Sequence, residues 1–369
     1  TSFSLDCGLK FNYTQTGRCQ IVRVPRYTTL LISGAGYIGA AAWNGTVGGI
    51  AVVEVETNAT LSSTPSFSVT GRGFRGGAVE NLSTLLGANK FGHVSGVEGA
   101  YKGESIVGDT GTYRPLASVF CRGAIANGGG GGTAHNAGGG GGANGGVVAA
   151  YRAYGNPDPT WATAWNLESP GFSTVTSSGG GRGGYSFSSN NLNPNTTGPG
   201  AGTSWGGDNR RNMGGFGGRP LNYSTGKIFV GGGGGAGDAN DGYGTPAGNG
   251  GGMVYILCYG NLSGAGTIVA DGGAGNNTAT GGFCSGRDGA GGGGGGGTVI
   301  LNVVGTTNLT AATAIFARGG AGGTVNFGGG CTSADAYGPG AGGGGGYIGV
   351  TGTLPPVAVT GGTTGVVTG

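Results

Sequence analysis

Side chains of the kinds that usually carry out catalysis are sparse in this chain of 369 residues. The two histidines, His93 and His135, both lie in glycine-rich stretches, and no Gly-X-Ser-X-Gly motif points to a serine hydrolase. The 15 acidic residues are scattered without the local signature of a glycosidase. The sequence therefore favours a protein that is not an enzyme.

One segment, residues 34–39 (Gly-Ala-Gly-Tyr-Ile-Gly), has the spacing of a dinucleotide-binding loop. Such a loop must be followed by a helix whose N-terminus holds the pyrophosphate. The stretch from Gly39 to Ile50 contains further glycine turns and is too short for a helical crossover. We interpret the motif as a glycine turn and expect no cofactor.

A second segment, residues 238–242 (Asp-Ala-Asn-Asp-Gly), places oxygen ligands around a sharp glycine turn, as calcium loops do. It lacks the bidentate glutamate of an EF-hand. A solvated turn is the interpretation that we favour, and Ca²⁺ near Asp238, Asn240 and Asp241 is the alternative.

Six cysteines without a Cys-X-X-Cys motif argue against zinc-finger and thioredoxin sites and fit an oxidising compartment. Buried thiols are the alternative to disulfides. The candidate disulfides pair Cys7 with Cys19 across a short hairpin-like segment, Cys284 with Cys331 at corresponding places of a repeat, and Cys121 with Cys258 by elimination.

Asn-X-Ser/Thr sequons occur nine times, more often than chance would give, and each could accept an N-linked glycan if exposed in a secreted protein. Asn261 and Asn308 fall at corresponding places of the repeat. They would lie on one exposed edge, or in a ladder of hydrogen bonds between repeats. The candidates are Asn12, Asn44, Asn58, Asn81, Asn195, Asn222, Asn261, Asn276 and Asn308.

The sequence pattern around these groups recurs with an offset of 47 residues, so that Ile268 matches Ile315 and Asn261 matches Asn308. Repeats of this length are typical of units that bury a core only by stacking on one another. Glycine supplies 99 residues, including the run Gly291–Gly297. Extended polyglycine-II-like chains packed side by side would order such runs.

Short strands are expected where Val, Ile, Thr and aromatic residues lie between Gly, Pro and Asn, as in 28–33, 50–56 and 67–70. The segment from Phe11 to Gly36 (FNYTQTGRCQIVRVPRYTTLLISGAG) resembles the entry of extracellular glycine-rich domains, such as that of anaplastic lymphoma kinase. From residue 128 onward, alternating glycine runs and apolar strands are similar to glycine-rich bacterial surface proteins and to phage tail-tip adhesins built as polyglycine-II sandwiches.

We therefore expect an all-β chain with very little α-helix. Residues 1–125 would form an N-terminal β-sandwich-like domain, and residues 126–350 a glycine-rich β-solenoid or polyglycine-II sandwich. Residues 351–369 would form an uncharged extended tail.

Charged residues make up only 9% of the chain, against a typical figure of about 25%. The net charge is +3 without a basic run, so we expect no nucleic-acid partner. No apolar stretch of about 18 residues occurs, so we expect no membrane span. A surface this poor in charge favours self-association.

The tail would be an aggregation hazard if it were left free. We expect it to insert as an extra strand into the next subunit and link subunits head to tail, with folding back onto its own chain as the alternative. Its apolar residues are Leu354, Val357, Val359, Val366 and Val367.

These features predict a structural subunit of a secreted extracellular filament or surface layer that carries N-glycans and has itself as partner. A receptor- or glycan-binding adhesin on a polyglycine scaffold is the first alternative. An ice-binding protein is the second.

Overall fold

The computed structural model describes residues 20–83, 91–116, 118–133, 136–146, 179–181, 183–184, 214–240, 242–279, 288–326, 337–365 and 367–368. Strands are far more frequent than helices among these residues, and the helices are short, which confirms the expected all-β class. The elements are β1 (Arg26–Tyr27), β2 (Leu30–Ile32), β3 (Ile38–Gly39), β4 (Ile50–Val55), β5 (Ala59–Leu61), β6 (Phe67–Ser68), η2 (Gly96–Glu98), α1 (Thr110–Tyr113), η3 (Arg114–Leu116), η7 (Tyr223–Thr225), β7 (Met253–Cys258), β8 (Leu262–Gly264), β9 (Ile268–Val269), β10 (Thr298–Val303), β11 (Thr307–Leu309), β12 (Ile315–Phe316), β13 (Val325–Asn326), β14 (Tyr347–Val350), β15 (Val357–Ala358) and β16 (Val367–Thr368).

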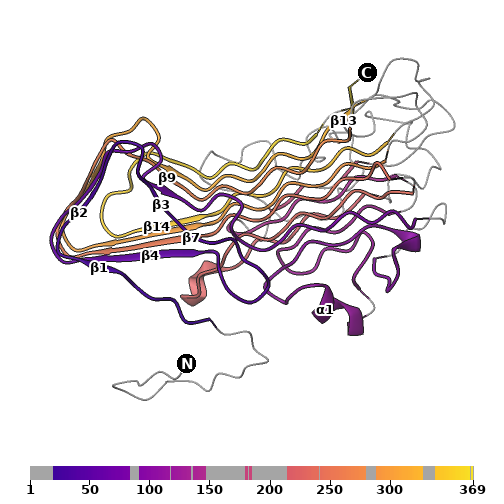
Figure 1. Ribbon diagram of the computed structural model, residues 1–369, viewed down its shortest axis with the longest axis horizontal. Helices are drawn as coiled ribbons and strands as arrows, with labels where there is room; N and C mark the ends of the chain where they lie inside the picture. Colours follow the sequence, from indigo (N-terminus) through magenta and orange to yellow (C-terminus); the bar gives the residue numbers. More distant parts are fainter. Residues whose placement is uncertain are drawn as a thin grey trace.

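Three parallel sheets enclose one apolar core, and we call this part of the molecule the strand prism. The sheets have the strand orders β1-β4-β7-β10-β14, β11-β8-β5-β2 and β15-β12-β9-β6-β3. Each pass of the chain, which we call a coil, adds a strand to one sheet after another. The coil of β4, β5 and β6 thus stacks on the coil of β7, β8 and β9. Figure 1 shows the prism at the left of the view.

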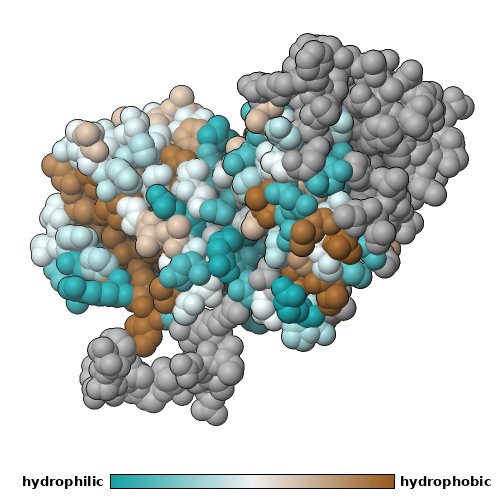
Figure 2. Space-filling model, turned by 45° about the vertical axis from the view of Figure 1, so that its right-hand side comes forward, coloured by the Kyte–Doolittle hydropathy of each residue, from teal (hydrophilic) through white to brown (hydrophobic). Residues whose placement is uncertain are grey.

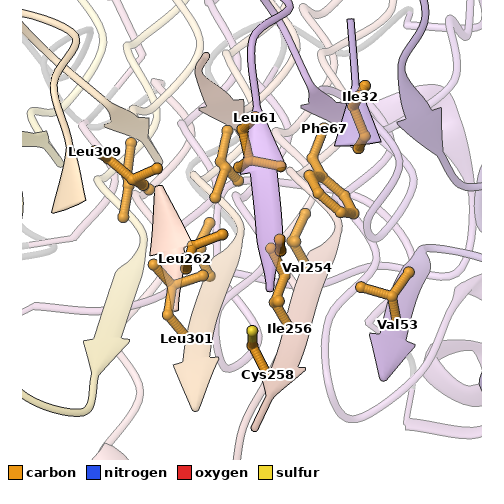
Figure 3. Packing of buried hydrophobic residues seen from close by; sticks show 14 of the residues in the cluster. Ile32, Val53, Leu61, Phe67, Val254, Ile256, Cys258, Leu262, Leu301 and Leu309 are labelled. Carbon is orange, nitrogen blue, oxygen red and sulfur yellow. The ribbon is translucent and has the colours of Figure 1, made fainter. Parts of the chain in front are cut away.

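The core follows from the alternation of side chains along each strand. In β7, Val254, Ile256 and Cys258 point inward and are fully buried, whereas Tyr255 and Leu257 are half-buried on the outside. Parallel pairing in register stacks the inward residues of neighbouring coils into apolar ladders. Figure 3 shows inward side chains from several strands converging on this core.

Residues 69–252 are an insertion between β6 and β7, two strands that belong to adjacent coils. Val53 and Phe67 from the N-terminal part share one core cluster with Val254 and Leu301. The boundary expected at residue 125 therefore does not separate two cores, and residues before it supply the first two coils of the prism. The rise in glycine content near residue 128 falls inside this insertion, and glycine runs continue beyond it, as at Gly291–Gly297.

Beside the prism, extended glycine-rich segments run side by side toward the other end of the molecule (Figure 1), and we call them the glycine array. Along the segment 231–238, the backbone amides donate in rotation to three neighbouring segments, so the pattern repeats every three residues. The first neighbouring segment accepts the amides of Gly231, Gly234 and Gly237 at Gly251, Gly248 and Thr245, respectively. The second accepts those of Gly232, Gly235 and Asp238 at Ala143, Gly140 and Ala137, and the third accepts those of Gly233 and Ala236 at Glu104 and Tyr101.

The glycine array depends on the absence of side chains, because its backbones lie too close together to admit them. A Cβ atom added to Gly293 would overlap the carbonyl oxygen of Gly320, and one added to Gly235 would overlap that of Gly130. Overlap with backbone cannot be relieved by turning a flexible side chain. The glycine runs are therefore required for packing between segments.

Replacing Gly293 with alanine should lower the free energy of unfolding by about 1–3 kcal/mol or more, the usual range for overpacking a tight interior. Chemical denaturation measures this change. Gly111→Ala is the matched control, since Gly111 is an exposed residue of α1 where a Cβ would meet only the side chain of Asp109 at 3.3 Å. Equal stability of the two variants would show that the array is not closely packed at Gly293.

Candidate functional site

The two ends of the strand prism expose sheet edges to which no other described strand is hydrogen-bonded. We call β1, β2 and β3 the first edge, and β14, β11 and β15 the last edge. All strand pairs inside the prism are parallel. The last edge of one molecule and the first edge of a second copy could therefore meet with their strands in the same direction.

Apolar core residues are incompletely covered at these two edges. Ile38 at the first edge is half-buried, as are Ile348, Val350 and Val357 at the last edge, and all four pack against the core cluster. Their equivalents in the inner coils, such as Leu301, are almost fully buried. Leu30 and Ile32 of β2 and Leu309 of β11 are buried, so each end presents a core layer that is uncovered only in part.

Charge is almost absent from the six edge strands. Arg26 in β1 is their one charged residue. Its guanidinium Nε lies 3.6 Å from Glu54 and 3.1 Å from Glu56, so it pairs with carboxylates of the neighbouring strand and the turn that follows it. The edge strands themselves contain no lysine or proline, residues that commonly keep sheet edges apart, although Pro25 directly precedes β1 and Pro356 directly precedes β15.

The C-terminal tail is part of the fold. Val357 lies in β15, which pairs with β12, and Val367 lies in β16, which pairs with β13. Val359 is buried and Leu354 is exposed, while Val366 lies outside the described residues. The tail therefore pairs with strands of its own chain, as the alternative prediction had it, and insertion into a second subunit stays a prediction.

Seven of the nine sequon asparagines are exposed, as an N-glycan acceptor must be, and Asn12 and Asn195 lie outside the described residues. The exposed positions are Asn44, Asn58, Asn81, Asn222, Asn261, Asn276 and Asn308.

Asn261 and Asn308 do not occupy corresponding places. β8 and β11 align Ser263 with Asn308, because two additional residues of this repeat lie in the loop after β11. Asn261 lies instead between Asn58 and Thr306. Its amide donates to Oδ1 of Asn58 at 2.9 Å, and its own Oδ1 accepts from the amide of Thr306 at 2.9 Å. A hydrogen-bond ladder between coils therefore exists, but it consists of Asn58, Asn261 and Thr306 and does not include Asn308.

Cys121 and Cys258 are buried thiols that belong to different apolar clusters, so their predicted pairing is wrong. Cys258 points into the prism core (Figure 3), and burial raises the pKa of its thiol. The candidates Cys7, Cys19, Cys284 and Cys331 lie outside the described residues.

The residues of the calcium-like loop 238–242 differ in their exposure to solvent. Asn240 is exposed, as a solvated turn requires, and Asp241 lies outside the described residues. Asp238 is fully buried and its Oδ2 accepts from the amide of Asn136 at 2.8 Å. The solvated-turn interpretation is therefore wrong for Asp238. Within the described ranges, no three His, Cys, Asp or Glu side chains gather as a metal-binding group.

A groove of about 480 Å³ beside the glycine array is lined by charged residues that include Arg75, Lys102 and Glu104. Glu104 is buried and accepts from Arg75 Nε and Trp43 Nε1, both at 3.0 Å. Lys102 donates to Ser118 Oγ at 2.8 Å, and burial lowers the pKa of its ammonium group to about 8. These contacts hold loops of the insertion together and join them to Trp43 in the segment between β3 and β4.

The remaining candidates from the sequence are the glycine motif at residues 34–39 and the two histidines. Gly34 adopts a left-handed φ of 63° in the turn between β2 and β3, and no helix follows, as expected for a glycine turn. His93 accepts the amide of Ser95 at 3.2 Å, and His135 lies outside the described residues.

Comparison with known proteins finds no relative: no family model, no curated protein and no solved structure matches the chain. In the described part of the chain, no helix has the length and apolar character that crossing a membrane requires.

Cys121 and Cys258 should react with iodoacetamide without reductant, but only after the protein is denatured, because both thiols are buried. Peptide mass spectrometry after alkylation under native and denaturing conditions measures this. Peptides that become alkylated only after reduction would show that these cysteines form disulfides.

Proposed function

We propose that this protein is a structural subunit of a secreted extracellular filament or surface layer, in which copies stack end to end through the edges of the strand prism. The observation that carries the proposal is the correspondence between the first edge and the last edge, which have the same strand direction and unfinished apolar layers.

Stacking would continue the sheets of β14 and β15 from one molecule into the next, whereas β11 lies one coil further back, because no described strand pairs with its outer side. Parallel strands pair at a spacing of about 4.8 Å, so a second copy displaced along the stack could place its β1 on β14 and its β3 on β15. The two surfaces differ, and a contact between different surfaces that does not close into a ring gives a filament. This geometry replaces strand insertion by the tail as the proposed link.

In this account the strand prism is a short length of β-solenoid and the glycine array is a polyglycine-II lattice. The hydrogen bonding that repeats every three residues along the segment 231–238 supports the second assignment, because a polyproline-II-type helix has three residues per turn. A lattice of this kind would give each subunit a rigid body beside its assembly surfaces.

The composition of the surface also supports self-association. Charged residues are few, and Figure 2 shows a band of hydrophobic residues across the end of the molecule that carries the prism. Uncharged sheet edges are sites where strands of another chain can add. The exposed sequons support a secreted location, where they would carry N-glycans.

Replacing Val350 with lysine tests the link directly, because the charge would lie in the unfinished apolar layer of the last edge. Electron micrographs should show filaments for the purified wild-type protein and single particles for the variant. Ile38→Lys, at the first edge, should have the same effect.

Asn302→Lys is the control, since it adds the same charge to the outer side of β10 within the stack and should leave filaments intact. Thermal unfolding of each variant shows whether it is folded. Wild-type protein that stays as single particles at every concentration would contradict the proposal and favour the adhesin alternative.

A further inference from the structure

Unsatisfied polar atoms are rare among the described residues, and half of them lie around one carboxylate. Six buried side-chain oxygens lack a hydrogen-bond partner, and three of the six are Ser83 Oγ, Asn136 Oδ1 and Asp238 Oδ1. A buried oxygen without a partner costs about 1–3 kcal/mol, and more if it is charged. Three such atoms on residues that neighbour one another point to a ligand that bonds to oxygen.

The three residues are held next to one another by backbone hydrogen bonds. The amide of Asn136 donates to Oδ2 of Asp238 at 2.8 Å, and the amide of Ser83 donates to the carbonyl of Ala239 at 3.1 Å. Ser83, Asn136 and Asp238 are each at most 3% exposed. The hydroxyl of Ser83 faces the Asp238 carboxylate and partly lowers its pKa, yet no hydrogen bond of ordinary geometry joins them.

A second carboxylate lies close to Asp238. Asp288, also fully buried, lies near Asp238 and receives the amides of Asn240 at 3.3 Å and Tyr243 at 2.9 Å. In the described part of the chain, no ion pair gives Asp238 a basic partner. A buried carboxylate without such a partner must either bind a proton or coordinate a cation.

We propose that Asp238, Asn136 and Ser83 bind a calcium ion within the glycine array. Carboxylate, amide and hydroxyl oxygens are ligands that a hard cation accepts. Ca²⁺ tolerates the irregular geometry that three separate backbone segments supply, whereas Mg²⁺ demands near-ideal octahedral geometry. The ion would join the segments that contain these residues and would stabilise the array independently of filament assembly.

Proton binding makes a different prediction. Burial raises the pKa of Asp238 to about 8, and Asp288 adds to the rise. The ordinary value in an unfolded chain is about 3.9. Without a cation, the protonated form stabilises the fold fully below about pH 4, and this stability is lost as the pH rises toward 8. A bound Ca²⁺ would keep the carboxylate ionised and remove this loss.

Thermal unfolding of the full chain should therefore be followed from pH 5 to pH 8.5 in EDTA and in millimolar CaCl₂, together with calorimetric titration of Ca²⁺. We expect Ca²⁺ to raise the melting temperature most at high pH. Asp238→Asn should lose this calcium-dependent shift and one bound Ca²⁺ per chain. Glu56→Gln, which removes an exposed carboxylate, should keep both.

A wild-type melting temperature that falls with pH equally in EDTA and in CaCl₂ would overturn the proposal and leave a proton on Asp238. A calcium response that persists in Asp238→Asn would place the site elsewhere. Stabilisation by MgCl₂ but not by CaCl₂ would overturn the assignment to calcium. A wild-type melting temperature that Ca²⁺ leaves unchanged overturns the proposal even if the variant does not fold.

Discussion

Close approach of backbones without intervening side chains is the constraint on which the rest of this structure depends. In the glycine array, each segment gives its amides in turn to several neighbours, and a single methyl group would overlap a neighbouring carbonyl. Ordering each glycine costs roughly 0.5–1 kcal/mol more than ordering alanine. The array is therefore stable only where hydrogen bonds and contact with neighbours are nearly complete.

The strand prism and the glycine array support each other because the same coils pass through both. At their junction, Tyr223 stacks on Tyr347 with ring centroids 3.7 Å apart, and its hydroxyl lies 2.6 Å from Asn144 Oδ1 and 2.8 Å from Thr298 Oγ1. Tyr347 and Thr298 begin paired strands of the prism. The apolar core thereby anchors one end of segments that have almost no side chains of their own to bury.

Much of the prism could be predicted from the sequence, because alternating apolar residues specify strands locally. The segments expected at 50–56 and 67–70 contain β4 and β6, and the match of Ile268 with Ile315 is a true register. The single core could not be predicted, since the coils on either side of residues 69–252 are joined only in space. A local sequence pattern does not show that the chain comes back after residue 252 to pair β7 with β4.

The candidate site was harder to predict than the strands. The offset of 47 residues failed for Asn308 because two extra residues in one loop shift the register of one sheet relative to another. The tail looked free because its partners, β12 and β13, precede it by tens of residues. The grouping of Ser83 and Asn136 around Asp238 had no signal in the sequence, because the three belong to segments brought together only by the array.

Amide hydrogen exchange within Gly292–Gly297 tests the central claim most directly. These six amides bond to six different residues of neighbouring segments, although the glycines belong to no strand or helix. The account predicts protection comparable to that of β7 and β10, with exchange only when the whole protein unfolds. Exchange as fast as that of the exposed turn at 351–354 would show that the glycine runs are loosely held and would contradict the account.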